Sequence, residues 1–262
     1  MSLALTHLHC RLDGQAVLQD ISLSAGAGCT ALIGPNGAGK STLLRVMAGD
    51  SAWLPGMTVT GHAELDGVPL GSLPALSLAR RRAFLLQQQP EHLHLPVDEL
   101  LCLAAWPHGG SGLRGETLYR DALTRWELGT LATRAYDALS GGERQRVQLA
   151  RTWLQMRLHP HAHERLWLLD EPQTALDLPH QRQLRQQLQE EAASGATVVF
   201  STHDLNFALR SADRVIALAG GRILADGEPA AIADPALLQH VFGVAFSCHV
   251  HPGDGRPWVM TE

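Results

Sequence analysis

A glycine-rich run that ends in a lysine and two hydroxyl residues could hold the phosphates of a nucleotide. Residues 34–42 fit the pattern Gly-x-x-x-x-Gly-Lys-Ser/Thr. Glycines let backbone N–H groups turn inward around phosphate oxygens, and the lysine of this pattern reaches the β- and γ-phosphates while its hydroxyl binds Mg²⁺. The candidate nucleotide-binding residues are therefore Gly34, Pro35, Asn36, Gly37, Ala38, Gly39, Lys40, Ser41 and Thr42, with Ser41 also a candidate metal ligand.

A pair of carboxylates follows a second apolar run, Leu166-Trp167-Leu168-Leu169. Asp170 would end a buried strand, where it could hold Mg²⁺ through the water shell of the ion. Glu171 would then face the γ-phosphate and polarise the attacking water as a general base. A solvated acidic turn is the alternative, and the phosphate-binding pattern upstream argues against it.

Alternating strand and helix patterns must position these residues. An apolar run at 30–33 precedes the glycine-rich loop and a helical pattern at 43–48 follows it, which is the context that the motif requires. The alternation predicts an α/β fold with a mainly parallel sheet. Further strands are expected at 3–8, 17–23, 59–65, 84–86, 166–169, 197–200, 214–218 and 222–225, and helices at 75–82, 118–126, 142–156 and 179–193.

Composition narrows the class of protein. The chain has 262 residues, 45% hydrophobic and 18% charged, and a net charge of −5, which argues against nucleic acid as the main partner. The four cysteines are widely spaced, without zinc-type spacing, and are expected to be reduced. No apolar run reaches the about 18 residues that a membrane span needs, so any role at a membrane is expected to depend on a partner.

A third motif, Leu139-Ser140-Gly141-Gly142-Glu143, carries a resemblance to a known family. With the two motifs above, it resembles the signature of the ATP-binding subunits of ABC transporters. The resemblance implies a head-to-tail homodimer in which Ser140, Gly141 and Gly142 of one copy close over the ATP held by the other. Its glycines and the following helix N-terminus would form a second anion-binding site, without a lysine.

Three further segments match that family in order along the chain. Gln87 matches the glutamine that meets Mg²⁺ and the transmembrane partner, with Gln88 as the competing position. Asp177, in Thr174-Ala175-Leu176-Asp177, matches the loop that links the two ATP sites. His203, which follows a strand, matches the histidine that hydrogen-bonds the γ-phosphate and orients Glu171 or the water.

The resemblance implies one ABC ATP-binding domain over residues 1–262, with ATP and Mg²⁺ as cofactors. The expected division is a core with an antiparallel β subdomain at 1–87 and 158–245, an inserted helical subdomain at 88–157, and a tail at 246–262 that reads as a hairpin. One departure is Leu12, which stands where many members stack an aromatic residue on adenine, and this puts base selectivity in doubt.

Two groups of residues lie outside these motifs. His159, His161 and His163 alternate, and a solvated loop is favoured over a metal site because no cysteine or carboxylate set completes the ligands. Trp106, Trp126 and Trp153 lie in the helical region, where core packing is the default and a partner surface is the alternative for Trp106.

The resemblance also implies a role and a location. Without a fused membrane span, the chain is expected to be the ATPase of an importer on the cytoplasmic face of the inner membrane, with separate permease subunits and, indirectly, a substrate-binding protein. The stretch from Phe84 to Gln89 and the insertion from Met156 to Arg165 resemble cobalamin importers most. Haem and ferric-siderophore import are the alternatives, and a non-transport ABC ATPase is the rival class.

Overall fold

The central sheet carries the ends of the strands that the motifs follow. The computed structural model describes residues 1–50, 55–87, 93–110, 113, 116–253 and 255–262. Among these residues, six strands pair in the order β10-β9-β3-β8-β7-β6, parallel except for the β9–β10 hairpin. They are β3 (Gly28–Ile33), β6 (Arg82–Leu85), β7 (Leu166–Asp170), β8 (Thr197–Ser201), β9 (Arg214–Ala219) and β10 (Arg222–Gly227). The predicted α/β class with a mainly parallel sheet is confirmed.

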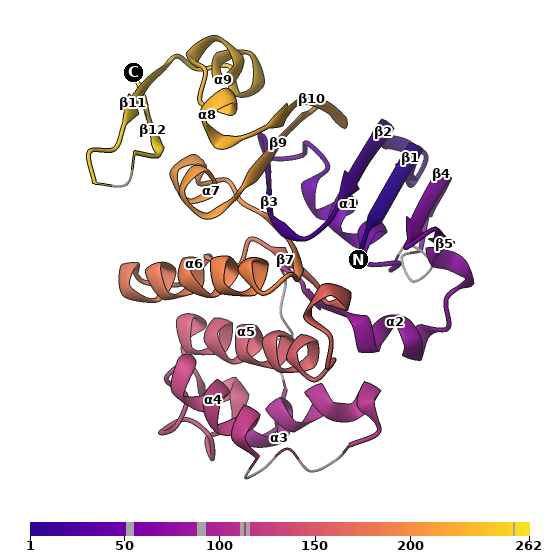
Figure 1. Cartoon of the computed structure of the whole chain (residues 1–262), viewed down its shortest axis with the longest axis vertical. Coiled ribbons are helices and arrows are strands. Elements are labelled where there is room, and N and C mark those ends of the chain that lie inside the picture. The colour runs from indigo at the N-terminus through magenta and orange to yellow at the C-terminus, as the bar shows by residue number, and fades with distance from the viewer. Residues whose placement is uncertain (51–54, 88–92, 111–112, 114–115, 254) are drawn as a thin grey trace.

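A second sheet is antiparallel and includes the N-terminal strand of the chain (Figure 1). Its strands pair in the order β2-β1-β4-β5 and are β1 (Leu3–Leu12), β2 (Gln15–Ala25), β4 (Met57–Leu65) and β5 (Val68–Pro69). Asp13 and Gly14 join β1 to β2 with positive φ angles of 49° and 80°, as the Asp-Gly pattern predicts for a tight hairpin turn.

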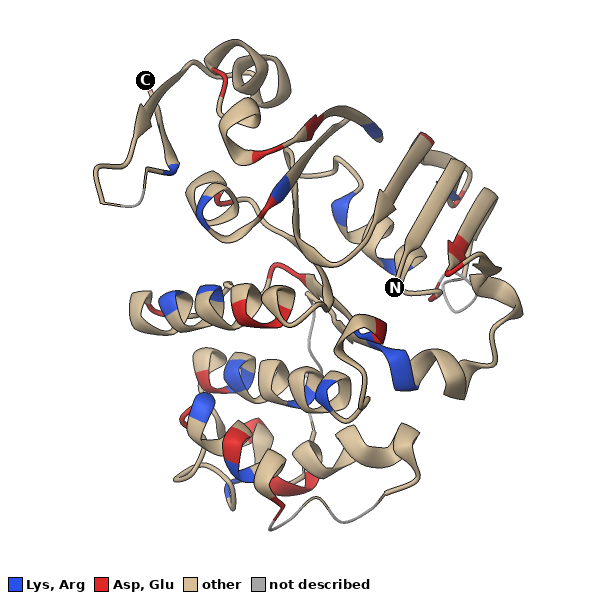
Figure 2. Cartoon of the chain, viewed as in Figure 1, with Lys and Arg blue, Asp and Glu red and all other residues tan. Residues whose placement is uncertain are grey.

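Most of the helical residues between 97 and 157 form a separate layer. Figure 1 shows α5 between α6 and the α3–α4 pair. The elements of this stretch are α3 (Val97–Cys102), a 3₁₀ helix (Leu103–His108), α4 (Thr117–Arg125), a 3₁₀ helix (Tyr136–Ala138) and α5 (Gly141–Arg157). Charged residues of both signs occur on α4, α5 and α6 (Figure 2), and α5 carries Glu143 in its first turn and arginines along the rest of its length.

The remaining helices flank the sheets, and the chain ends in a hairpin. The helices are α1 (Lys40–Met47), α2 (Ala75–Arg81), α6 (Leu178–Ala193), α7 (Leu205–Ser211), α8 (Pro229–Ile232) and α9 (Pro235–Phe242), with 3₁₀ turns at Leu70–Ser72 and Ala162–Glu164. The expected C-terminal hairpin is present as β11 (Phe246–Val250) and β12 (Pro257–Thr261).

The central strands are buried on both faces. In β7, Trp167 and Leu169 pack into a core with the helices, whereas Leu166 and Leu168 pack with α1 and the antiparallel sheet. This explains why β7 reads as a continuous apolar run rather than an alternating one. It also leaves the carboxyl ends of β3, β7 and β8 as the place where polar side chains can gather.

The three tryptophans of the helical layer do not share one environment. Trp126 and Trp153 are each 1% exposed, which confirms core packing. Core packing is wrong for Trp106, which is 72% exposed. In its 3₁₀ helix the small residues Ala104 and Ala105 face the core, so the tryptophan is directed outward.

Candidate functional site

The predicted phosphate-binding loop borders a cavity of about 560 Å³ at the carboxyl end of β3. The structure brings to it residues from three separate motifs, namely Gln87, Glu171 and His203. The other lining residues are Val17, Asn36, Gly37, Ala38, Gly39, Lys40, Ser41 and Thr42. The sequence predicts all of these except Val17.

The loop backbone depends on glycine where it passes close to its neighbours. Gly34 has φ 148°, and a Cβ there would lie 2.1 Å from the carbonyl oxygen of Leu218. Gly39 has φ 100° and directly precedes α1. The loop therefore turns into the first N–H groups of a helix, where backbone donors and the helix dipole favour an anion.

Lys40 lies at the start of α1 with its ammonium folded over the loop. Its Nζ donates to the carbonyl oxygens of Gly34 at 2.7 Å and Pro35 at 3.1 Å. Burial lowers the pKa of Lys40, and the nearby carboxylates of Glu171 and Asp170 act in the opposite direction. The only fixed positive side chain on this cavity among the described residues is thus placed at the phosphate-binding loop.

Asp170 ends β7 and is 2% exposed. Its Oδ1 accepts hydrogen bonds from the hydroxyls of Ser201 at 2.6 Å and Ser41 at 3.1 Å. Burial raises the pKa of Asp170, and these two hydrogen bonds partly offset the rise. A carboxylate and a hydroxyl at this distance form the oxygen donor set that Mg²⁺ prefers, so Ser41 and Asp170 fit a magnesium site.

Glu171 follows with a left-handed backbone, φ 48°, which turns its side chain into the cavity. Its N–H donates to the Ser201 hydroxyl at 3.0 Å, and its Oε2 lies 3.3 Å from Nδ1 of His203. The hydroxyl of Thr174 donates to the same Oε2 at 3.4 Å. A carboxylate held in this way can accept a proton from water at the cavity.

Gln87 is described and lines the cavity, as the preferred position requires. The competing Gln88 lies outside the described residues, as do Gln89 and His92.

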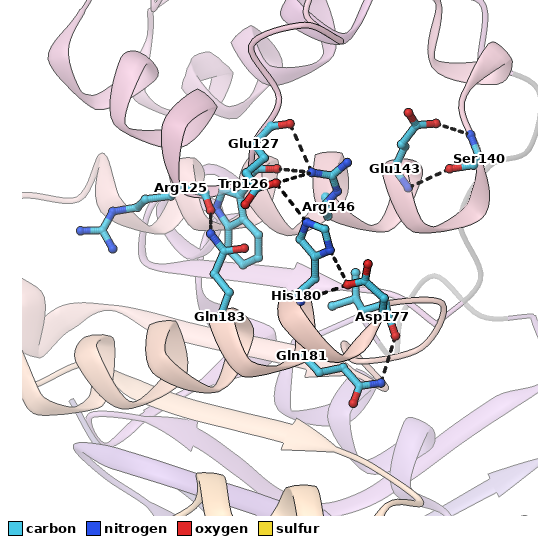
Figure 3. A network of polar contacts seen from close by, with 11 residues as sticks. Arg125, Trp126, Glu127, Ser140, Glu143, Arg146, Asp177, His180, Gln181 and Gln183 are labelled. Atoms are coloured by element: carbon cyan, nitrogen blue, oxygen red, sulfur yellow. Dashed lines mark hydrogen bonds and ion pairs between the residues drawn. The ribbon is translucent and has the colours of Figure 1, made fainter.

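The residues that resemble the family signature lie elsewhere. Ser140 caps α5 and forms a reciprocal capping box with Glu143, with distances of 3.3 and 2.7 Å (Figure 3). Gly142 packs on the 174–177 segment, since a Cβ there would lie 2.8 Å from the carbonyl oxygen of Ala175. Within the described part of the chain, neither Ser140, Gly141 nor Gly142 lines the phosphate-loop cavity.

Asp177 caps α6, where its Oδ1 accepts a hydrogen bond from the backbone N–H of His180 at 3.1 Å. The pKa of the Asp177 carboxyl is held below its ordinary value by the hydrogen bonds from the backbone and the ring of His180. Its side chain is 64% exposed and does not reach the cavity within the described structure.

Three residues that contact this site were missed at the sequence level. The Ser201 hydroxyl donates to the Asp170 carboxylate and accepts from the backbone N–H of Glu171. The sequence clue that could have identified Ser201 is a polar residue at the end of β8, the strand that pairs in register with β7 and places Ser201 beside Asp170. Gln145 donates from its side chain to the Pro172 carbonyl at 2.9 Å and so links α5 to the acidic turn. Val17, in β2, gives no signal by type or spacing.

Leu12 and the histidine cluster lie away from the cavity. Leu12 is 37% exposed at the end of β1 and is absent from the cavity lining in the described structure. The rings of His159, His161 and His163 follow one another at 6.0 and 5.7 Å. Within the described residues, no group of three or more His, Cys, Asp or Glu side chains could hold a metal ion.

The cysteines and the helix lengths bear on the class of protein. The four cysteines are free, as expected for reduced thiols. No helix in the described portion of the chain is long and apolar enough to cross a membrane.

Comparisons with known proteins agree with this geometry. A family model described as "ABC transporter" matches residues 18–174. The chain is 38% identical to the hemin import ATP-binding protein HmuV of Pseudomonas entomophila, over 97% of this chain and 98% of that protein. It is 40% identical to the protein of the same name from Burkholderia pseudomallei, over 95% of each. A solved ATP binding subunit of an ABC transporter superposes with a TM-score of 0.75 at 26% identity, covering 94% of this chain and 96% of that one.

Proposed function

The chain belongs to the ABC transporter family as an ATP-hydrolysing import subunit, and from that premise we propose that it energises haem uptake through a separate permease. The observation that supports haem as the cargo is the similarity, over nearly the whole chain, to two proteins named for hemin import. These relatives favour haem over cobalamin, which the stretch from Phe84 to Gln89 had suggested. Cobalamin finds no support in them.

The proposed chemistry is hydrolysis of ATP at the phosphate-loop cavity. The loop N–H groups and Lys40 hold the phosphates, and Glu171 accepts the proton of the attacking water. His203 orients Glu171 through the 3.3 Å contact of their side chains. Ser41, Gln87 and Asp170 would hold Mg²⁺, which when bound neutralises charge on the β- and γ-phosphates.

A second copy would complete the site. Residues 140–142 do not line the cavity of their own chain within the described structure, and we infer that they act on the nucleotide held by a second copy across a head-to-tail interface. The N-terminus of α5 would then present unpaired N–H groups to the phosphate opposite. Asp177 would lie at this interface because it is exposed beside the same segment.

The permease would dock on the helical layer. An apolar groove runs between the end of β6 and helices α3 and α5, with Gln148 and Arg151 on its wall. Its other lining residues are Phe84, Leu86, Leu93, Leu100 and Leu103. It lies directly after the strand that leads to Gln87, so a cytoplasmic helix seated there can act on the cavity. This arrangement would hold the chain at the cytoplasmic face of the inner membrane, with a substrate-binding protein on the other side.

The cargo can be tested by uptake in cells. A strain that lacks this chain should fail to use haem as its iron source while taking up cobalamin and ferric siderophores normally. A plasmid copy should restore haem use, and a copy with Glu171→Gln should not. Lost cobalamin uptake with normal haem use would return the assignment to cobalamin. The ATPase assignment is tested separately, by the hydrolysis rate of the purified chain with its permease.

A further inference from the structure

One histidine joins the helical layer to the 174–177 segment. His180 lies in the first turn of α6 with its side chain 19% exposed. Its Nδ1 lies 2.5 Å from Oδ1 of Asp177, and its Nε2 lies 3.5 Å from Oε2 of Glu127 (Figure 3). Both ring nitrogens therefore face carboxylate oxygens, one in the 174–177 segment and one just after α4.

The Glu127 end of this contact is fixed in place by neighbouring helices. Arg146 of α5 donates to the carbonyl oxygens of Trp126 at 3.0 Å and Glu127 at 3.2 Å, and its guanidinium lies 3.9 Å from the Glu127 carboxylate. Gln183 of α6 donates to the carbonyl oxygen of Arg125 (Figure 3). The end of α4 is thus held by α5 and α6 on either side of His180.

The Asp177 end is less constrained. The Asp177 side chain is 64% exposed, and it accepts a hydrogen bond from the backbone N–H of His180 and contacts the ring of the same residue. A cap to the backbone fixes one oxygen but leaves the carboxylate free to rotate about its last bond. The ring of His180 approaches the same oxygen, Oδ1, so the second contact holds that oxygen more firmly and thereby limits this rotation.

We propose that His180 is a positioning residue that ties Asp177 to the end of α4, so that the position of the helical layer sets the orientation of the Asp177 carboxylate. This rests on the proposed function, in which Asp177 lies between the two ATP sites of the dimer. His180 does not touch the cavity as described, so it would act through Asp177. The ring is suited to this role because its Nδ1 lies in hydrogen-bond range of Asp177, while its Nε2, which has no hydrogen-bond partner among the described residues, lies 3.5 Å from the Glu127 carboxylate on the opposite side.

The histidine can be replaced by residues that keep one contact at a time. Asn places an amide near the position of Nδ1 and can still reach Asp177, whereas Gln reaches the position of Nε2 and Glu127. Both carboxylates are about two-thirds exposed, so losing either contact should cost little stability and the variants should fold. His240, which is exposed on α9, offers a matched control, His240→Ala.

The experiment measures kcat and KM for ATP, and ATP affinity, with the full chain in complex with its permease. His180→Ala should lower kcat about 2- to 30-fold, the range for a residue that couples sites without touching the ligand, and leave ATP affinity unchanged. His180→Gln should behave like His180→Ala, and His180→Asn should retain an intermediate rate. His240→Ala should match the wild type.

A second background separates positioning from general damage. Asp177→Ser keeps an N-cap but is too short to meet the ring. On that background His180→Ala should cause no further loss of kcat, because the residue through which it acts is already gone. The proposal would be overturned if His180→Ala caused a further loss of the same size on the Asp177→Ser background. It would also be overturned if, on the wild-type background, His180→Ala or His180→Asn kept the wild-type rate, or if His180→Ala weakened ATP binding. A wild-type complex without hydrolysis would instead reject the proposed function itself.

Discussion

Oε2 of Glu171 lies 3.3 Å from Nδ1 of His203, although the two residues are 32 positions apart in the sequence. The contact arises because β7 and β8 are neighbouring parallel strands in register, with Asp170 opposite Ser201. Each chain segment continues past its strand, so a carboxylate and an imidazole meet above the phosphate-binding loop. The relationship places the proposed general base and its proposed orienting partner just after adjacent strands of one sheet.

Glu171→Gln should therefore keep ATP bound but hydrolyse it about 10²- to 10⁴-fold more slowly, because the amide cannot accept the proton of the water. The ATP-bound dimer should accumulate and can be seen by gel filtration with ATP. Glu228→Gln, at an exposed position, serves as the control. Persistent activity together with monomer alone would contradict both the base and the dimer.

Lys40 is the only lysine in the sequence, which allows a direct test of its position. Lys40→Ala should abolish hydrolysis, because charge stabilisation at the transferring phosphate is worth several kcal/mol, or about 10²- to 10³-fold or more in rate. An amine-reactive reagent should inactivate the wild type, and mass spectrometry should find the label at Lys40. ATP should protect that site but leave labelling at the N-terminal amine unchanged. Equal labelling with and without ATP would count against the phosphate-loop assignment.

Asp170 is expected to cost stability in the absence of Mg²⁺ and nucleotide. Burial raises its pKa above the unfolded value of 3.8, so the folded state loses stability as the pH rises through the folded pKa. Asp170→Asn keeps an acceptor for Ser41 and Ser201 but removes the charge. In chelator, it should raise Tm by about 2–4 °C at pH 7.5, the scale of 1 kcal/mol in a chain of this size, and should do so less below the unfolded pKa of 3.8, where the carboxyl is protonated in both states. Hydrolysis should be lost, and an unchanged or lower Tm would argue against the buried charge.

The sequence was informative where one residue type is required by chemistry and its context is local. The loop at 34–42 is a single uninterrupted motif, and so is the Asp170–Glu171 pair. The alternation of strand and helix patterns predicts the sheet that carries both motifs. Ser201 was missed because its role depends on strand pairing, which its own neighbours in sequence do not reveal. The expectation that Trp106 packs in the core was wrong for a related reason. Its position in a helical region does not show which face of the helix packs against the rest of the chain.

The cargo could not be read from the site residues, because the roles proposed for them concern ATP and Mg²⁺ and not the transported molecule. The stretch from Phe84 to Gln89 resembles one importer group, but its described part ends β6 and brings Gln87 to the cavity, and neither of these roles concerns the cargo. Whole-chain similarity carries more information on cargo than any motif does. The tail was readable as a hairpin from its turn residues, and its contact surface emerged only from the fold.

That tail is fastened to α7 by Arg256. Its Nη1 donates to the carbonyl oxygens of Arg210 and Ala212 at 3.0 Å each, at the C-terminal end of α7. Arg256→Ala removes these donors from partly buried carbonyls and should lower stability by about 1–3 kcal/mol, seen as a lower Tm. Arg256→Lys should recover part of the loss, because an ammonium can still reach one carbonyl. An unchanged Tm for Arg256→Ala would show that the hairpin is held instead by the two hydrogen bonds between Asn206 and the Val259 backbone and by the apolar contacts of Phe246 and Val259.

The head-to-tail arrangement can be tested at Gly141, and the structure shows why this glycine rather than its neighbour is suitable. A Cβ at Gly142 would lie 2.8 Å from the Ala175 carbonyl oxygen and would strain the chain itself, whereas one at Gly141 meets only the Ala175 side chain, at 3.8 Å. Gly141→Leu should therefore fold and bind ATP as a monomer with normal affinity. Hydrolysis should be lost, because the added side chain blocks the approach of α5 to the nucleotide held by the other copy. Mixing Gly141→Leu with Lys40→Ala should recover about half of the wild-type rate per mixed dimer, since one of its two sites is intact, and about a quarter for a random equimolar mixture, an estimate that treats the sites as independent. Loss of ATP binding by the Gly141→Leu monomer would instead place this segment in the cavity of its own chain.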